Sequence, residues 1–179
     1  NPNSLGQPAY HIELQVRHDV TWQAGDIAEI QPGNSQDRIN HFLKLQNISA
    51  DVVVPSLQMT LAQALWNRDL TVALQPYQDV EQLLIQLPIL PSREYSIASI
   101  PEQHRLGLVV RQQRDTQGEL GLGSGWLTEH LSTKDTVALR IRSNESFHLI
   151  TDNRPIICIG NGTGIAGLLS LLSARAHSS

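Results

Sequence analysis

The sequence has one cysteine, no long apolar run and no excess of basic residues, and each shortage excludes a class of protein. The single cysteine, Cys158, excludes an internal disulfide and a cysteine-based metal cluster. Because it stands in an apolar, strand-like run, we expect it to be buried in a core. No stretch approaches the roughly 20 apolar residues of a membrane span, and the N-terminal residues lack a signal-peptide pattern. We therefore expect a cytoplasmic protein and no membrane contact from this segment.

The charge balance argues against nucleic acid as a partner. The chain has 13 Lys and Arg against 17 Asp and Glu, a net charge of -4, whereas nucleic-acid binders usually concentrate basic residues on one face. A small molecule that carries phosphate needs only a local cation. The seven histidines show no metal-ligand spacing, so we expect no metal site. The run GLGSGWL lacks the G-x-S-x-G pattern of a hydrolase nucleophile.

Alternating apolar residues predict strands in residues 1–150. In residues 9–16 the apolar positions are Tyr10, Ile12, Leu14 and Val16, which is the period-two pattern of a half-buried strand. Similar patterns follow at residues 27–30, 93–99, 106–113 and 136–142. Between Ser35 and Leu87, helical spacing appears instead at residues 37–45, 60–70 and 77–87. Residues 123–131 read as the start of a helix capped by Ser124. The spacing resembles a small antiparallel barrel with a helical insertion.

A second unit begins near residue 151. The apolar run PIICI, residues 155–159, predicts a buried strand, and residues 165–176 have helical composition. Between them, Gly162, Gly164 and Gly167 fit the G-x-G-x-x-G spacing of a dinucleotide turn, whose backbone amides approach phosphate closely. The acidic residue that usually supports this interpretation would lie beyond Ser179. The alternative interpretation, a glycine turn that only lets a strand pack on a helix, therefore stays open.

Residues 92–99, SREYSIAS, combine the groups that a flavin diphosphate needs. Arg93 offers a cation for bidentate phosphate contacts, Tyr95 an aromatic ring and Ser96 a hydroxyl. From these residues alone, an ordinary strand that packs Tyr95, Ile97 and Ser99 on one face is an equally good interpretation. The order of the other motifs along the chain favours the flavin.

The run SREYSIAS, the strand LGLVV, the turn GLGSGWL, the segment NESFHL and the turn IGNGTGIA follow one another as in one family. The chain resembles the FAD and NADP(H) module of diflavin reductases, the family of sulfite reductase flavoprotein and cytochrome P450 reductase, which is ferredoxin reductase-like. The resemblance covers nearly the whole chain. It implies a fold of mainly β structure plus helices. Residues 1–150 would form a six-stranded antiparallel FAD-binding barrel with a helical insertion at about 36–87. Residues 151–179 would form the first strand and helix of an incomplete nicotinamide-binding α/β domain.

The resemblance also implies roles for single residues. Arg93 would bind the FAD pyrophosphate, Tyr95 would stack on the isoalloxazine, and the Ser96 hydroxyl would lie near flavin N5 as the residue closest to the chemistry. Three further groups would contact cofactors: the strand along the flavin (Gly107, Leu108, Val109), the pyrophosphate turn (Gly121, Leu122, Gly123, Ser124) and the nicotinamide dinucleotide turn (Gly160, Gly162, Thr163, Gly164).

The implied activity is that of an NAD(P)H-dependent flavin oxidoreductase. Hydride would pass from NADPH or NADH to FAD, and electrons would leave for a flavodoxin-like FMN domain or another acceptor. The chain departs from the family at Asn161, at Gly167 to Leu169 and near Gln113, where the adenine is commonly met by an aromatic ring. Two alternatives therefore stay open: a single-flavin reductase with a separate acceptor protein, and a non-catalytic FAD-barrel binding module.

Three arginines near the barrel strands, Arg105, Arg111 and Arg114, allow two interpretations. They form either a docking patch for an acidic flavodoxin-like partner or an ordinary exposed strand face.

Overall fold

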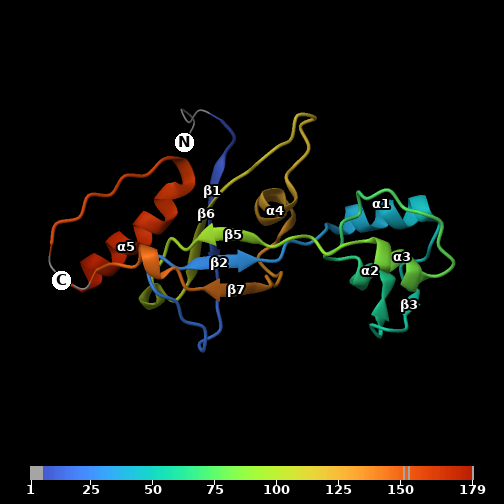
Figure 1. The fold of residues 1–179 in the computed structure, drawn as a ribbon, viewed down its shortest axis with the longest axis horizontal. Helices are drawn as coiled ribbons and strands as arrows, with labels where there is room; N and C mark the ends of the chain where they lie inside the picture. The colour runs from blue at the N-terminus through green and yellow to red at the C-terminus, as the bar shows by residue number, and fades with distance from the viewer. Residues whose placement is uncertain (1–5, 151, 153, 179) are drawn as a thin grey trace.

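The computed structural model describes residues 6–150, 152 and 154–178. The molecule is elongated, with strands in the middle, a helical insertion at one end and the last helix at the other (Figure 1). The residues predicted to bind a flavin therefore lie in the strand region, between the two helical ends.

Five strands form two open antiparallel sheets. Strand β1 (Ala9–Leu14) pairs with β6 (Leu106–Arg111), and β2 (Ile27–Ile30) lies between β5 (Arg93–Ser96) and β7 (Leu139–Arg142). Among the described residues, one bridge, from Ile97 to Leu108, joins the two sheets. The predicted closed barrel of six strands is not confirmed, because β5 pairs along its length with β2 and the bridge to β6 comes from Ile97, the residue after β5.

The register of β5 decides which of its side chains face the core. Arg93 pairs with Ile30 and Tyr95 with Ala28, and side chains of directly paired residues lie on the same face of a sheet. Ala28 and Ile30 are at most 1% exposed, so Arg93 and Tyr95 lie on the core side. Ser96 alternates to the outer face.

The outer face of the three-stranded sheet carries a row of ion pairs. Glu29 of β2 pairs with Arg140 and Arg142 of β7, and Arg142 also pairs with Glu94 of β5 at 2.8 Å. These contacts link all three strands across their solvent side.

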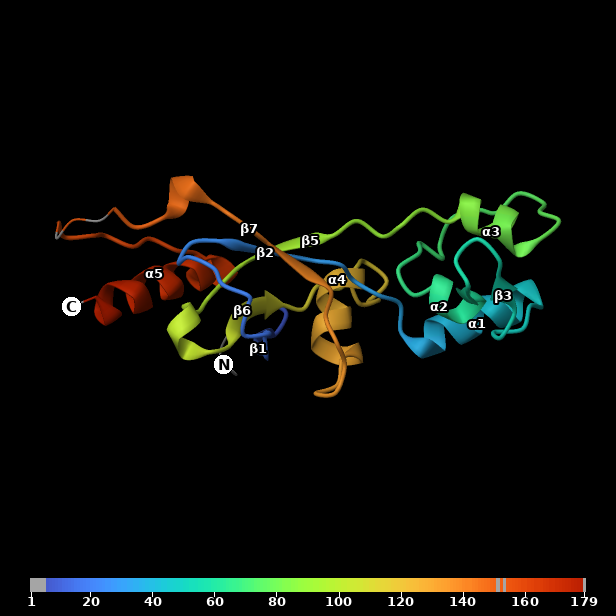
Figure 2. The same ribbon diagram turned by 90° about the horizontal axis from the view of Figure 1, so that it is seen from below.

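The residues between β2 and β5 form a separate unit at one end of the molecule (Figure 2). This unit has its own hydrophobic core. Its elements are α1 (Gln36–Gln46), β3 (Val53–Val54), β4 (Met59–Thr60), α2 (Leu61–Ala64) and α3 (Val80–Gln86). Side chains cap each helix N-terminus, which satisfies amides that lack acceptors within the helix: Ser35 for α1, Thr60 for α2 and Asp79 for α3. Residues 60–70 have helical spacing, but they form only the single helical turn α2.

The glycine-rich run after residue 120 forms a helix that starts earlier than expected. Helix α4 (Leu122–Gly125) has Gly121 at its N-cap and continues as a π-helical turn (Trp126–His130). The expectation that Ser124 caps this helix is wrong, because Ser124 lies inside the helix. Its Oγ accepts a hydrogen bond from the backbone N–H of Gln113 at 2.9 Å. Single 3-10 turns occur at Pro101–Gln103, Glu145–Phe147 and Gly162–Gly164.

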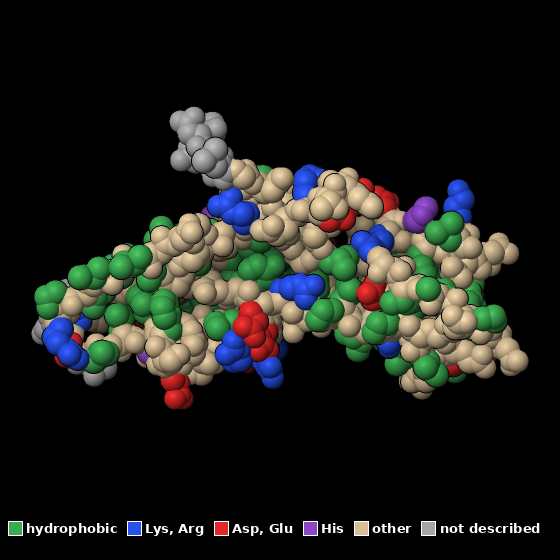
Figure 3. Space-filling model, turned by 45° about the horizontal axis from the view of Figure 1, so that its top comes forward, with side chains coloured by type: hydrophobic (Ala, Val, Ile, Leu, Met, Phe, Trp, Pro, Cys, Tyr) green, Lys and Arg blue, Asp and Glu red, His purple; other side chains and the backbone are tan. Residues whose placement is uncertain are grey.

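The C-terminal residues form a helix but not the expected strand. Helix α5 (Ile165–His177) follows the glycine turn and packs Leu171 against Ala24 and Ile100. Residues 155–159 are not in a strand, and Ile157 and Ile159 are 90% and 89% exposed. A buried parallel strand needs a partner on its edge and cover on both faces, and the described residues provide neither. Cys158 is accordingly exposed, which corrects the expectation that it lies in a core. Figure 3 shows hydrophobic side chains on the surface at the α5 end of the molecule.

The described residues include neither a helix suited to span a membrane nor a cluster of metal ligands. No described helix combines the length and the apolar character needed to cross a membrane. No group of three or more His, Cys, Asp or Glu side chains in the described part of the chain is arranged to hold a metal ion.

Candidate functional site

Arg93, Tyr95 and the glycine turn of α4 meet at one place. A Cβ atom on Gly123 would lie 2.7 Å from Cγ of Arg93 and 3.3 Å from the Tyr95 hydroxyl. A side chain at position 123 would force Arg93 or the turn to shift, so glycine allows the first turn of α4 to approach β5 this closely. The structure thus brings the stem of the Arg93 side chain and the Tyr95 phenol next to a helix N-terminus that lies about 30 residues further along the chain.

The two side chains of β5 differ in their surroundings. The Arg93 guanidinium donates to the backbone carbonyls of Pro91 and Ser92, at 3.1 and 3.4 Å, in an exposed setting. Tyr95 is half-buried, and this burial raises the pKa of its phenol, although the nearby Arg93 charge acts in the opposite direction. Tyr95 is therefore neutral at physiological pH, and its ring is held against the core.

The turn that leads into α4 is fixed to the end of β6. The Gly121 N–H donates to the Gln113 carbonyl at 2.9 Å, and the Gln113 N–H donates to Ser124 Oγ. The Ser124 hydroxyl oxygen therefore holds the backbone of this turn. The Leu122 and Gly123 amides lie in the first turn of the helix, where no intrahelical acceptor is available.

The predicted strand residues Gly107 and Leu108 lie in the core. Leu108 is fully buried, and the Gly107 N–H donates to Ser99 Oγ at 2.8 Å. β1 covers the edge of this strand, with Glu13, Ile12 and His11 opposite Gly107, Leu108 and Val109. Contact between these three residues and a flavin remains a prediction.

Ser96 lies on the other face of β5 from Tyr95, next to α5. A Cβ atom on Gly167 would lie 3.6 Å from Cβ of Ser96 and 2.9 Å from Cε1 of Phe147. The predicted N5-proximal hydroxyl is therefore next to the helix that follows the predicted nicotinamide turn.

The glycine turn itself is exposed and uses a conformation that favours glycine. Gly162 has φ +56°, and the Gly164 N–H closes the turn on the Asn161 carbonyl at 3.0 Å. Thr163 is half-buried, and a Cβ on Gly160 would lie 2.8 Å from Cδ1 of Leu168. The four predicted residues of this turn are thus kept together beside the start of α5.

Arg111 is a functional candidate that the sequence did not single out for this turn. Its Nη2 lies 3.8 Å from the Cβ position of Gly162, and its Nη1 donates to the Gln7 carbonyl at 2.6 Å. Arg105 instead pairs with Glu13 at 3.5 Å, and Arg114 donates to the Gly118 carbonyl at 2.7 Å. The three arginines therefore have different local partners. No sequence signal connects Arg111 with Gly162, because the contact depends on how α5 docks.

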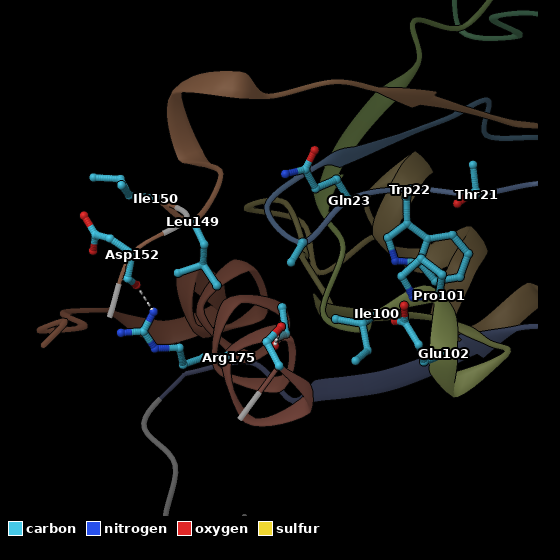
Figure 4. Close-up of a pocket in the computed structure, with 13 residues that line it drawn as sticks. Thr21, Trp22, Gln23, Ile100, Pro101, Glu102, Leu149, Ile150, Asp152 and Arg175 are labelled. Carbon is cyan, nitrogen blue, oxygen red and sulfur yellow. Dashed lines mark hydrogen bonds between the residues drawn. The ribbon is translucent and has the colours of Figure 1, made fainter. Parts of the chain in front are cut away.

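Two cavities lie apart from these residues. One, of about 570 Å³, is bounded by Trp22, Ile100, Leu149 and Arg175 where α5 meets the strand region (Figure 4). The Arg175 guanidinium closes one side through a hydrogen bond to the Asp152 carbonyl. The other, of about 320 Å³, lies between the insertion and the π-helical turn. No predicted site residue lines either cavity.

Comparison with known proteins supports the resemblance. No protein-family profile matches the chain. The chain is 42% identical over 106 residues to the inducible nitric oxide synthase of Homo sapiens, covering 54% of this chain and 9% of that protein. It is 41% identical over 101 residues to the sulfite reductase [NADPH] flavoprotein alpha-component of Sodalis glossinidius (strain morsitans), covering 53% and 17%. The match to the sulfite reductase flavoprotein confirms the likeness to diflavin reductases drawn from the sequence.

The fold is similar to that of a solved structure. The ferredoxin-NADP+ reductase from Plasmodium falciparum with 2'P-AMP aligns with a TM-score of 0.58 and 20% identity, over 97% of this chain and 47% of that chain. At this identity the likeness shows the fold alone, which is ferredoxin-NADP+ reductase-like. The chain spans less than half of each of these three proteins.

Proposed function

We propose that the chain is the FAD-binding part of a flavoprotein oxidoreductase that takes hydride from NADPH or NADH. The observation that carries the proposal is the approach of Gly123 to Arg93 and Tyr95, since a Cβ there would fill the space beside both side chains. When bound, FAD supplies the redox chemistry, by accepting a hydride and releasing electrons one at a time. The residues present fit the diphosphate and the ring of that cofactor.

The roles of the residues follow from their chemistry. Arg93 neutralises a phosphate through bidentate hydrogen bonds, and the Leu122 and Gly123 amides donate to the same anion at the start of α4. Tyr95 offers a neutral ring on the core side of β5 for stacking. Ser96 places a hydroxyl next to α5, where it orients the reactive nitrogen by hydrogen bonding.

The nicotinamide cofactor binds at the turn of Gly160, Gly162, Thr163 and Gly164. Arg111 adds a positive charge beside Gly162, and this strengthens the site for a diphosphate. Two of the similar proteins are named for NADPH or NADP+, which favours NADPH as the donor. Electrons leave for an acceptor, either a flavodoxin-like FMN domain or a separate protein.

The first experiment is to load the purified protein with FAD and record its visible spectrum before and after anaerobic addition of NADPH or NADH. A flavin spectrum that bleaches supports the proposal, and denaturation then identifies the released flavin as FAD or FMN. A chain that takes up no FAD contradicts it. FAD that binds but is reduced by neither donor favours the non-catalytic module, an alternative that Asn161 and Gly167 to Leu169 support.

The second experiment tests Ser96. Ser96→Ala removes the hydroxyl but leaves Arg93 and the α4 turn intact. We expect flavin reduction to slow by about tenfold with little change in FAD affinity. An unchanged reduction rate would show that the hydroxyl has no part in the reaction.

A further inference from the structure

The buried carboxylate of Asp26 connects its own turn with the loop of residues 144–148. Asp26 precedes β2 and is 5% exposed. Its Oδ2 accepts from the Gln23 N–H at 2.8 Å, and its Oδ1 contacts His148 Nε2 at 2.7 Å and the Asn144 N–H at 3.1 Å. Three hydrogen bonds on one buried carboxylate define its position closely.

The charge state of this carboxylate follows from its neighbours. Burial alone raises the pKa of Asp26, but the hydrogen bonds from Gln23, His148 and Asn144 together lower it below the ordinary value of 3.8. Asp26 is therefore an anion at neutral pH, and His148 Nε2 donates its proton to it. In the described part of the chain, His148 is the side chain that hydrogen-bonds to the Asp26 carboxylate.

The backbone around Asp26 is equally connected. The Asp26 carbonyl accepts from the N–H of Ile97, the residue after Ser96, at 3.1 Å. The preceding Gly25 N–H donates to Ser170 Oγ of α5 at 3.1 Å, and Ser170 Oγ donates to the Gly167 carbonyl. One turn thus contacts both the end of β5 and the first half of α5.

The loop of residues 144–148 contacts both the turn at Gly25 and helix α5. Gly25 has φ +102°, and a Cβ there would lie 2.5 Å from the Phe147 carbonyl oxygen. The Phe147 ring lies against Gly167, whose other neighbour is Ser96. The loop therefore packs between the Asp26 turn and α5, on the side where Ser96 is exposed.

We propose that Asp26 and His148 are a positioning pair that holds the Asn144–Phe147 loop and thereby fixes Ser96 against the start of α5. The proposal rests on the proposed function for the role of Ser96 in hydride transfer. The pair acts through the loop and does not touch the reacting atoms. Its loss would shift the nicotinamide turn relative to the flavin residues while leaving Arg93, Tyr95 and Gly123 in place.

The test compares His148→Leu, which breaks the contact, with His148→Gln, whose amide N–H can still donate to Asp26. The matched control is His41→Leu, an exposed histidine of α1 in the insertion. In the FAD-loaded protein, we expect His148→Leu to slow reduction by NADPH about tenfold, because small misplacements of reacting groups are costly. FAD affinity should change less than about twofold, because Arg93 and Gly123 are untouched. His148→Gln should restore most of the rate, and His41→Leu should match the parent.

A second measurement does not depend on the flavin. Amide hydrogen exchange at Gly25 and in the first turn of α5 should be about tenfold faster in His148→Leu than in the parent or His148→Gln. Unchanged exchange would overturn the proposal even if the protein binds no FAD. Faster exchange with an unchanged reduction rate would show that the contact stabilises the structure without affecting the reaction, and would refute the positioning role. A parent that is not reduced at all contradicts the proposed function. In that case the exchange measurement alone tests whether the contact between Asp26 and His148 holds the loop and α5 in place.

Discussion

The indole rings of Trp66 and Trp126 meet edge to face, with their centroids 6.1 Å apart and their planes at 70°. Trp66 belongs to the insertion, and Trp126 to the π-helical turn that continues α4. Through this contact a residue of the insertion packs against the core between the sheets, which includes Trp126.

Trp66→Leu should loosen this junction. Aromatic pairs of this geometry contribute beyond their buried area, so we expect the free energy of unfolding to fall by roughly 1–3 kcal/mol. Urea unfolding measures the loss, and Leu45→Ala on the exposed face of α1 serves as the control. A loss no larger than that of the control would mean that the ring contact does not hold the two units together.

Gly123→Ala should reduce FAD binding. The added methyl group would lie 2.7 Å from Cγ of Arg93, so the side chain or the α4 turn must move. We expect FAD to bind at least about tenfold more weakly, since the phosphate loses aligned donors. Fluorescence titration with FAD checks this, with Thr133→Ala in an exposed loop as the control. Equal FAD affinity in both variants would show that the turn does not contribute to FAD binding.

Arg111→Gln should weaken NADPH binding but not FAD binding. The substitution removes the charge beside Gly162, and hydrogen bonds to charged groups contribute about 1.5–3 kcal/mol, or roughly tenfold to a hundredfold in affinity. Arg105→Gln removes an exposed arginine that pairs with Glu13, and is the matched control. Calorimetric titration with NADPH gives both values. If the two variants lose affinity equally, the effect reflects net charge and not the contact at Gly162.

Acid should destabilise the protein through Asp26. The pKa of this carboxyl is lower in the folded chain than its ordinary value of 3.8. Its contribution to stability is therefore complete above pH 3.8 and is lost as the pH falls below that value through the folded pKa. Asp26→Asn should be less stable than the parent at pH 7, and the difference should shrink toward pH 3. Urea unfolding at both pH values checks this, and a difference independent of pH would assign the effect to packing.

The strands and the longer helices could be predicted from the sequence because their cause is local. Alternation from Tyr10 to Val16 and in residues 27–30 depends only on which side chains face the core, and all five predicted sheet strands of residues 1–150 are present. The helical spacing of residues 37–45 likewise matches α1.

Contacts that depend on how elements dock could not be predicted. The meeting of Asp26 with His148 and of Arg111 with Gly162 depends on the position of α5 and the loop before it. The predicted role of Ser124 is wrong because a serine after a glycine turn is typical of an N-cap. In the structure its Oγ instead accepts a hydrogen bond from the Gln113 N–H. The run of residues 155–159 has the composition of a buried strand, but composition does not supply the neighbours that would bury it.

The insertion begins and ends at neighbouring points of one sheet. Ile30 of β2 is paired with Arg93 of β5, and the Gln31 side chain donates to the Leu90 carbonyl at 2.8 Å. Because the chain leaves and re-enters so close together, a change in the length of the insertion does not require a change in the pairing of β2 with β5. A reengineered protein in which a short hairpin loop replaces it should keep the β2 to β5 pairing, which makes this junction a natural place to graft foreign domains.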